Sequence, residues 1–457
     1  MSAIFTQPEI NLREIANKVE CLDITPHTEN VLNVADYIST LDGSSDVSGE
    51  LQKLFDVAVS DSKSNIVFVP ENVTLRIDSD VNMPNFTSLV GEVRMGQPDA
   101  GSRIQSHGGS LVVNNGNTIA GLVIRRDGAT TAEGTGVGVA GTLVNYLDTA
   151  IKGNPSDQNT DIILRDLAIF GFDTGIDVTN INTNPATTSP YTRGRWVVEN
   201  INIDCKLGFN MNNVKDTCYF SNVHGWPFLG NGITTLPDNL PSGTKSGAPR
   251  SILFQMGMGG TEADLGADWL RFSGCFAHTH ERLLLANNCN KLSMANCGYD
   301  FEWFQSAPEN SYGVLLQGFA SNITIVGSQF SGGEHSILAN LDVTGGLNRA
   351  VTLSGCSFAN AKIQHVQMSA NAAVSGCTFT NSAVEDIPNP DWAYVGVGDA
   401  APDQTSHSIT GCQFINITGG IANGGNATPM YSVANGFTDV TTNEAAGVQI
   451  VSYNPAP

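Results

Sequence analysis

The C-terminal half of the chain repeats a short pattern of alternating hydrophobic and polar positions. Each copy is an alternating segment, a Gly or Asn, and a second short segment that usually carries an aromatic residue. The copies are LRFSGCFAH (270–278), LSMANCGYD (292–300), ITIVGSQFS (323–331), VTLSGCSFA (351–359), AAVSGCTFT (372–380), HSITGCQFI (407–415) and YSVANGFTD (431–439). Alternation with a period of two predicts strands, and recurrence every 21 to 35 residues predicts a solenoid of stacked coils.

One place in each copy is usually occupied by Cys. Its occupants are Cys275, Cys297, Ser328, Cys356, Cys377, Cys412 and Gly436. In a parallel β-helix, strands of successive coils stack about 4.8 Å apart, so equivalent side chains form ladders. We therefore predict that the Cys and Phe places are inward-facing rows. The chain has 9 Cys without the spacing of a zinc site, so the thiols are predicted to be free and buried.

The N-terminal part of the sequence predicts a capping helix and the first strands of the solenoid. Residues 46–59 place apolar residues at helical spacing, with Ser48 as the expected N-cap, so an amphipathic helix should seal the first coil. Strands follow within 65–92, one of them ending in Pro, and the segment closes on Leu-Val-Gly-Glu. Looser coils follow at 117–127, 160–178, 195–211 and 216–225.

This order resembles the start of the pectate-lyase-like superfamily, to which many phage tailspikes belong. The resemblance covers about 45 residues directly and extends along the chain only through the repeat. It implies an all-β, right-handed parallel β-helix with a short helical N-terminal segment. The chain lacks the Asp-Asp-Thr that usually precedes the helix and the Gly-Thr-Tyr after the Pro. The resemblance therefore predicts the fold, and it does not predict which reaction the chain catalyses.

The expected organisation has four parts. Residues 1–45, with short helices predicted at 12–19 and 31–41, are expected to attach the chain to a virion or to knot three chains together. A second capping element is the alternative. Residues 46–92 hold the capping helix and first strands, 93–440 the β-helix with the glycan-binding groove, and 441–457 a C-terminal strand or cap.

The net charge of the chain limits the classes of partner that it is expected to bind. The chain has 44 acidic and 22 basic residues and a formal charge of −22, which disfavours nucleic acids and anionic membranes. Its N-terminus lacks a signal peptide, and no segment reaches the length of a membrane span. We expect a protein folded in a host cytoplasm, released by lysis and located in a phage tail.

Candidate catalytic residues concentrate in 268–282 and 297–304. Cleavage of a glycosidic bond needs two carboxylates facing one groove, with aromatic side chains to hold the sugars. On one extended strand, Asp300 and Glu302 would face the same way, about 6.5 to 7 Å apart at Cα. Burial of one carboxyl beside Tyr299 and Trp303 would raise its pKa and keep it protonated as the acid.

Aligning the coils gathers further residues on neighbouring rungs. It pairs His278 with Asp300, His280 with Glu302, and Glu281 with Trp303. The predicted catalytic residues are Asp300 and Glu302, followed by Glu281 and Glu334. The predicted substrate-binding residues are Trp303, Tyr299, His278, His280, Trp269 and Trp392. A loop with Glu385, Asp386 and Asp391, and the Pro- and Gly-rich segment 223–250, are further candidates for the wall of a groove.

Other interpretations stay open. The carboxylates and histidines are alternatively ordinary outer-face residues paired with Arg271 or Arg282. A metal held by His278, His280 and Glu302 has suitable donors but no support from spacing, and we predict neither metal nor cofactor. The expected function is endo-hydrolysis of a bacterial surface polysaccharide by a homotrimeric tailspike. A polysaccharide lyase and a non-enzymatic binding spike are the alternatives.

Overall fold

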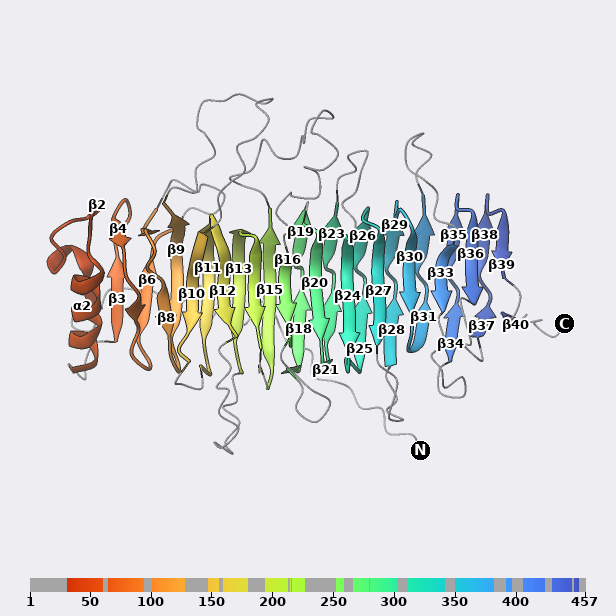
Figure 1. Cartoon of the computed structure of the whole chain (residues 1–457), viewed down its shortest axis with the longest axis horizontal. Helices are drawn as coiled ribbons and strands as arrows, with labels where there is room; N and C mark the ends of the chain where they lie inside the picture. Colours follow the sequence, from red (N-terminus) through yellow and green to blue (C-terminus); the bar gives the residue numbers. More distant parts are fainter. Residues whose placement is uncertain are drawn as a thin grey trace, which may run out of the picture.

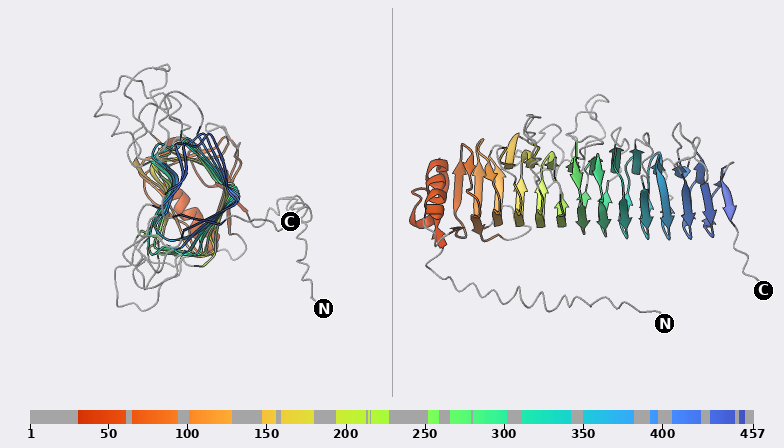
Figure 2. Two further views of the ribbon diagram at one scale, coloured as in Figure 1. Left: turned by 90° about the vertical axis from the view of Figure 1, so that its right-hand side faces the viewer. Right: turned by 90° about the horizontal axis from the view of Figure 1, so that it is seen from below.

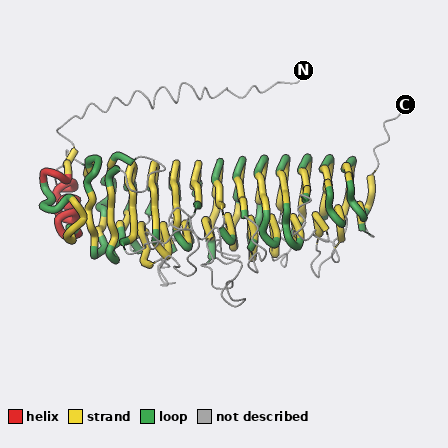
Figure 3. The backbone as a smooth tube through the Cα atoms, turned by 90° about the horizontal axis from the view of Figure 1, so that it is seen from above, coloured by secondary structure: helices red, strands yellow, loops and turns green. Residues whose placement is uncertain are grey.

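The computed structural model is a right-handed parallel β-helix, which confirms the predicted fold (Figure 1). It describes residues 31–60, 65–93, 101–127, 147–155, 159–179, 194–212, 214, 216–226, 252–258, 266–278, 280–301, 311–341, 350–381, 392–396, 406–423, 430–445 and 448–451. The predicted helix at 12–19 and the segment 385–391 lie outside these residues. Figure 3 displays the coils stacked side by side along one axis.

Each full coil passes through three faces of the solenoid, each a ladder of parallel strands (Figure 2). The first face is β1 (Val31–Asn33), β3 (Ile66–Val69), β6 (Ser88–Gly91), β18 (Leu270–Ser273), β22 (Ser293–Ala295), β25 (Ile323–Val326), β28 (Ala350–Ser354), β31 (Asn371–Ser375), β34 (His407–Thr410), β37 (Met430–Val433) and β40 (Gln449–Val451). The second face is β2 (Asp42–Asp46), β4 (Thr74–Ile77), β7 (Arg103–Ser106), β19 (Phe276–His278), β23 (Gly298–Asp300), β26 (Gln329–Ser331), β29 (Ser357–Ala359), β32 (Thr378–Thr380), β35 (Gln413–Ile415) and β38 (Gly436–Thr438).

Four longer strands run through both of these faces. They are β9 (Thr118–Arg126), β11 (Ile163–Phe170), β13 (Val197–Asp204) and β15 (Cys218–Gly225). The third face is β5 (Val81–Asn82), β8 (Leu111–Val113), β10 (Leu147–Gly153), β12 (Phe172–Val178), β14 (Leu207–Met211), β16 (Ile252–Met256), β20 (Arg282–Asn287), β24 (Tyr312–Gly318), β27 (His335–Leu341), β30 (Gln364–Met368), β33 (Trp392–Gly396), β36 (Gly419–Asn423) and β39 (Thr442–Glu444). A separate pair, β17 (Ala267–Asp268) and β21 (Cys289–Asn290), lies at the turn between the third and first faces.

A row of left-handed residues bends each coil between the first and second faces. Its members, all with φ between 50° and 67°, are Gly121, Asp166, Asn200, Asn222, Gly274, Asn296, Gly327, Gly355, Gly376, Gly411 and Ala434. Gly, Asn and Asp adopt this conformation at the lowest cost, which explains the Gly or Asn in each repeat. The Asn222 amide donates to Oδ1 of Asn200 at 2.8 Å, so side chains also link successive bends.

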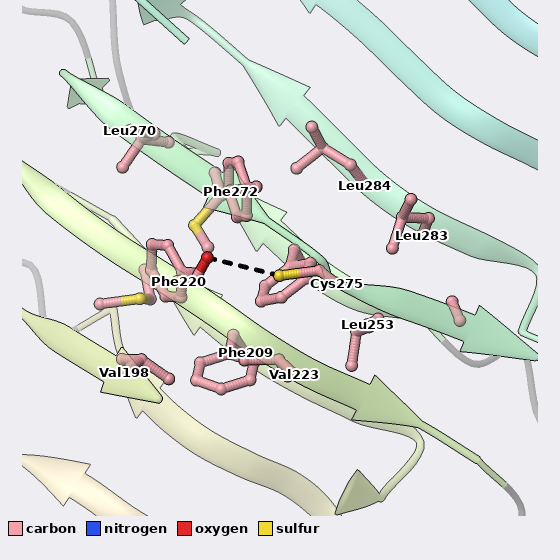
Figure 4. Close-up of a cluster of buried hydrophobic side chains, with 14 of the residues drawn as sticks. Val198, Phe209, Phe220, Val223, Leu253, Leu270, Phe272, Cys275, Leu283 and Leu284 are labelled. Atoms are coloured by element: carbon pink, nitrogen blue, oxygen red, sulfur yellow. Dashed lines mark hydrogen bonds between the residues drawn. The ribbon is translucent and has the colours of Figure 1, made fainter. Parts of the chain in front are cut away.

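Inward ladders form the core, as the repeat predicted. Phe330, Phe358, Phe379, Phe414 and Phe437 stack with centroid separations of 5.5, 4.9, 4.8 and 5.0 Å, close to the spacing of the coils. The Cys residues of the repeat are buried and free, which confirms that prediction. Figure 4 shows Cys275 among these apolar side chains, where its thiol donates to the carbonyl of Phe220 at 3.5 Å.

The last repeat differs by one residue from the predicted alignment. Gln413 pairs with Gly436 and Phe414 with Phe437, so Asn435, and not Gly436, takes the place of Cys412 in the final coil. The Asn435 side chain accepts a hydrogen bond from the Cys412 N–H at 2.8 Å. The correct register restores Phe437 to the aromatic ladder, and this packing is the physical reason for the shift.

Helix α2 (Ser48–Ser60) covers the start of the solenoid (Figure 3). Leu51, Leu54 and Phe55 are buried in the common core. The prediction of Ser48 as N-cap is wrong. The Asp46 carboxylate accepts from the Ser48 N–H at 2.9 Å, and the Ser48 hydroxyl accepts from the N–H of Asp78 at 2.9 Å. Within the described residues, no helix is long and apolar enough to cross a membrane.

Both ends of the predicted solenoid need correction. The predicted helix at 31–41 is wrong, because the segment begins with β1, which pairs with β3, and continues as a 3-10 helix at Val34–Asp36. Since β2 also pairs with β4, the first coil starts before residue 46. At the other end, β40 pairs with β37, so the strand alternative for this segment is correct.

Candidate functional site

An outward row on the second face carries aromatic and acidic side chains from successive coils. Ile203 is opposite Gly225, and Gly225 is opposite Ala277, so the following residues Trp226 and His278 are neighbours. His278 is in turn opposite Asp300, which confirms the predicted pairing. Each step along this row is about 4.8 Å. Trp226, His278 and Asp300 therefore form a line parallel to the solenoid axis.

The rings of this row stack into a platform made of His224, Trp226, Phe276 and His278. The Trp226 and His278 centroids lie 4.1 Å apart with an interplanar angle of 17°. Phe276 lies 6.3 Å from Trp226 and 6.2 Å from His224. His278 is buried while Trp226 stays 37% exposed. The platform thus presents a flat aromatic surface to solvent, of the kind that packs against the C–H face of a sugar ring.

Asp300 ends the platform with a solvent-accessible carboxylate. Its Oδ2 lies 3.7 Å from Nδ1 of His278, and the side chain is 45% exposed. The His278 side chain is only 6% exposed, so the carboxylate is the part of this pair that is open to solvent. Strand β23 ends at Asp300. Glu302 and Trp303, the predicted partners, lie outside the described residues.

A second group of polar residues occupies the turn between the second and third faces. Arg282, Tyr312 and His335 are consecutive members of one ladder. Nη2 of Arg282 donates to Oε1 of Glu281 at 3.2 Å, and its guanidinium lies 5.4 Å from the centre of the Tyr312 ring. A carboxylate, a guanidinium and a phenol therefore meet at the start of β20 and β24.

Glu281 and Glu334 hold equivalent places two coils apart. The Tyr312 N–H donates to the carbonyl of Glu281, and the Glu334 N–H donates to that of Ser311, which occupies the coil between them. Two steps of the ladder separate the two backbones by about 9.6 Å. Both residues are buried, at 4% and 8% exposure. Burial, then the charges of Glu334 and Glu281, raise the pKa of Tyr312.

Tyr299 is a buried residue that directly precedes Asp300 in the chain and contacts Glu281. Its hydroxyl donates to the carbonyl of Glu281 at 3.2 Å. Burial raises its pKa well above the usual value, and the charges of Glu281 and Asp300 act in the same direction. With 1% exposure, Tyr299 belongs to the core, so its predicted role in sugar binding is wrong. The repeat had already placed it in the Phe ladder.

His280 is likewise a buried structural residue. Its Nδ1–H donates to the carbonyl of His278 at 2.9 Å, and its ring packs so closely on Gly225 that a Cβ there would approach within 2.9 Å. Burial lowers its pKa to about 4, so the imidazole is neutral at neutral pH. The prediction that His280 contacts sugar is therefore wrong. It supports the platform from below.

The two remaining tryptophans lie at different places. Trp392 begins β33 opposite Gln364, in the ladder that also carries Arg282, Tyr312 and His335. Trp269 precedes β18 on the first face, and the bend at Gly274 separates it from His278. Trp392 thus lies beside the candidate site, whereas Trp269 does not, contrary to the grouping that we predicted.

The sequence reasoning missed Trp226. Trp226 directly follows the coil DTCYFSNVHG (216–225), which was recognised as a loose repeat and was not aligned with the stricter ones. Matching the left-handed Asn222 with Gly274 would have placed Trp226 beside His278. The Asn of the bend is the signal that finds this residue.

The site combines an aromatic surface with carboxylates in two environments, one exposed at Asp300 and two buried at Glu281 and Glu334. Acid–base chemistry on a bound sugar needs such a combination. Across the described part of the chain, no three His, Cys, Asp or Glu side chains gather in a way that would hold a metal ion.

Comparisons with known proteins identify similar folds only in solved structures. No protein family model matches the chain, and no curated protein matches its sequence. The A-module of mannuronan C-5 epimerase AlgE6 from Azotobacter vinelandii is 12% identical, with a TM-score of 0.54 over 93% of this chain and 100% of the module. The AlgE4 A-module gives 12%, 0.50 and the same coverage. The Dettilon tailspike protein gp208 is 12% identical, with a TM-score of 0.48 over 94% of this chain and 69% of the tailspike. The likeness to the two A-modules therefore shows a shared parallel β-helix fold.

Proposed function

We propose that the chain is a phage tailspike that binds a bacterial surface polysaccharide and hydrolyses it. The observation that carries this proposal is the row Trp226, His278 and Asp300, in which an aromatic stack ends in an exposed carboxylate. The polysaccharide lies against the platform with a glycosidic bond beside Asp300. Solved tailspikes and carbohydrate-active proteins with similar folds support this choice of class.

Hydrolysis uses two carboxyl groups in different protonation states. Asp300, open to solvent beside His278, is suited to activate water or to attack the sugar as an ion. The acid that protonates the leaving oxygen comes from Glu302, the partner predicted from the sequence, or from Glu281. Glu281 is the described candidate because the hydroxyl of Tyr299, the residue directly before Asp300, donates to the Glu281 carbonyl at 3.2 Å.

The substrate continues from Asp300 toward the third face. Tyr312 and His335 lie there on neighbouring coils, with Glu334 directly before His335, and Trp392 lies two coils further along the same ladder. Burial lowers the pKa of His335 to about 4, so its neutral imidazole can exchange hydrogen bonds with sugar hydroxyls. These residues supply binding and orientation rather than bond cleavage.

A polysaccharide lyase is the second candidate, and Arg282 is the observation that favours it. Its guanidinium lies beside Glu281 and Tyr312. In a lyase, such a cation neutralises the carboxylate of a uronate, and a nearby base takes the adjacent proton. We rank hydrolysis first because the described part of the site has more carboxylates than cations.

Product analysis tests the proposal. The full chain is incubated with purified capsule, O-antigen and exopolysaccharide from a panel of bacteria, and each digest is assayed in two ways. Hydrolysis predicts new reducing ends with no ultraviolet absorbance from an unsaturated sugar. Absorbance by the products would replace hydrolysis with elimination. Binding without new reducing ends or unsaturated products would indicate a non-enzymatic spike. If the chain neither binds nor cleaves any polysaccharide of the panel, the proposed function is overturned.

We also propose that three copies assemble in a virion, with residues 1–30 reaching the tail. Side-by-side packing of the exposed strand faces is the expected basis of the trimer. Light scattering should give three times the mass of one chain. A stable monomer at micromolar concentration would contradict the trimer. Antibodies against the chain should label the tails of intact phage particles, and unlabelled tails would contradict the location.

A further inference from the structure

We propose that a second saccharide-binding site, selective for sugars that carry a carboxylate, lies on the first face at Tyr219, Trp269, Arg271 and Lys291. We call these four residues the cationic patch. The inference does not depend on cleavage, because it concerns a different face from the platform. Its ligand class is an acidic glycan, with uronate residues as the simplest example.

Alternation on β18 places the cationic patch on the outer surface. Leu270 and Phe272 are buried in the core, so Arg271 projects outward, and Trp269, which directly precedes the strand, is 39% exposed. Arg271 lies directly opposite Tyr219 of the preceding coil, and its guanidinium is 5.5 Å from the centre of that ring. Two outward residues of one coil and one residue of the preceding coil therefore share a surface.

Lys291 completes the cationic patch from the following turn. Its Nζ lies 4.4 Å from the centre of the Trp269 ring, and 4.0 Å from Oδ2 of Asp268. Trp269 is 39% exposed and Tyr219 is 45% exposed, which is unusual for rings of this size. Each ring thus has a cation beside it and an edge open to solvent.

The backbone at Trp269 turns the chain onto the first face. Its φ is 59°, in the left-handed region. Lys291, in the equivalent place of the next coil, has a φ of 53°, and Arg195 and Asn322 have φ of 56° and 53° in the same turn of other coils. The conformation therefore belongs to a row of turns between the third and first faces, and it brings Trp269 and Lys291 side by side on successive coils.

The charges of the cationic patch favour a ligand that carries a carboxylate. Basic residues number 22 against 44 acidic ones, yet two cations meet two exposed aromatic rings here. Lys291 has the Asp268 carboxylate at 4.0 Å, whereas Arg271 forms no ion pair within the described part of the chain, so Arg271 is the cation most open to a ligand. A guanidinium holds a carboxylate through two parallel hydrogen bonds, while an aromatic ring holds the sugar face. A neutral sugar would use only the rings.

The cationic patch is distinct from the candidate catalytic site. Trp269 and Arg271 lie before the left-handed bend at Gly274, and Phe276 and His278 lie after it. Asn222 makes the same bend between Tyr219 and Trp226 in the preceding coil. The two surfaces therefore belong to different faces of the same coils, and variants can alter one without the other.

A calorimetric titration of the full chain with tetragalacturonate, and with neutral maltotetraose for comparison, tests this inference. The variant Asp300→Asn serves as background so that the probe is not cleaved. With the wild-type residues at the cationic patch, we expect tetragalacturonate to bind more tightly than maltotetraose. Added salt should weaken the binding of tetragalacturonate. Arg271→Gln with Lys291→Gln should weaken uronate binding about tenfold or more, because a charge-assisted contact is lost. Trp269→Ala should weaken it as well.

Lys206→Gln is the matched control. Lys206 is a comparably exposed cation on the third face, paired with Asp173, and its removal should leave the affinity unchanged. Circular dichroism checks that each variant is folded. Unchanged uronate binding in the double variant would overturn the site, as would equal binding of the neutral sugar. A fall in oligomeric mass of the double variant would instead identify a contact between copies of this chain.

Discussion

The indole of Trp226 stacks on the imidazole of His278, with ring centroids 4.1 Å apart, although the two residues belong to different coils. Parallel stacking of the coils produces this contact, because it brings equivalent positions of distant segments to about 4.8 Å from each other. The same rule places Asp300 next to His278. A solenoid can therefore build a binding surface with one residue from each coil.

Replacing Trp226 with Ala should weaken polysaccharide binding about tenfold or more, because burial of an aromatic side chain contributes roughly 1.5 to 3 kcal/mol. Affinity is measured with immobilised polysaccharide in surface plasmon resonance. Tyr37→Ala is the control, since Tyr37 is 54% exposed near the first coil, far from the platform along the axis. Equal affinity in wild type and Trp226→Ala would remove the platform from the binding site.

Asp300→Asn and Glu302→Gln should each slow cleavage by about two orders of magnitude or more, which is the usual contribution of positioned acid–base catalysis. The amides keep the shape of the groove, so adsorption to host cells should survive. Reducing-end assays measure the rate, with Asp173→Asn as an exposed carboxylate control.

The outcome of these variants also chooses between the candidate partners. If Glu302→Gln cleaves normally while Glu281→Gln does not, Glu281 is the acid and Glu334 is the next residue to test. Wild-type rates in both Asp300→Asn and Glu302→Gln would move the site elsewhere, first to the segment with Glu385, Asp386 and Asp391.

The fold was predictable because the repeat directly encodes the ladders. Aligning Cys275 with Cys297 was enough to pair His278 with Asp300. The site was less predictable, because burial depends on what covers each residue. Tyr299 looked like a surface aromatic beside two acids, but the same alignment puts its ring in the core ladder.

Loops of different length between the strands made the remaining alignments between coils harder to predict from the sequence. Glu281 and Glu334 occupy equivalent places because short turns precede both β20 and β27, while a longer segment precedes β24. Spacing from the repeat gives the alignment of the two acids, since Glu281 and Glu334 each lie six residues after the Cys place of their coil, at Cys275 and Ser328. The longer segment hides that Ser311 takes the equivalent place between them. Trp226 was missed because its coil carries Val223 where the stricter repeat that follows has Cys275, so the coil was not aligned on the Cys place.

His365 should make the protein sensitive to acid. Burial lowers its pKa to about 3, and neither ring nitrogen has a hydrogen-bond partner among the described residues. Below the ordinary histidine pKa of about 6.5, the unfolded chain binds a proton that the folded chain excludes. Stability therefore falls as pH decreases from about 6.5 toward 3, by about 1.4 kcal/mol per pH unit for this residue.

His365→Leu should reduce that loss and stabilise the protein at pH 7, because two unpaired buried nitrogens are removed. Urea unfolding at pH 7 and pH 5 measures both effects. His107→Gln is the control, because His107 is partly exposed and paired with Asp127. An identical pH dependence in wild type and His365→Leu would show that His365 is not buried in its neutral form.

The thiols of the core ladder should resist labelling in the native protein. Cys275, Cys297, Cys356, Cys377 and Cys412 are each at most 2% exposed, so a reagent in solution cannot reach their sulfur atoms while the protein is folded. A Cys21→Ser variant removes the cysteine outside the described residues, and a thiol reagent should then react only after denaturation. Rapid labelling of Cys275, Cys297, Cys356, Cys377 or Cys412 would contradict the inward ladder.

A crystal structure of the Asp300→Asn variant with fragments of the cognate polysaccharide tests the central claim most directly. The account predicts a sugar ring against Trp226 and Phe276, a glycosidic oxygen next to residue 300, and further sugars reaching toward Tyr312. Occupancy of the cationic patch is expected in addition if the glycan is acidic. Fragments bound only on another face, with the platform empty, would contradict the proposed site.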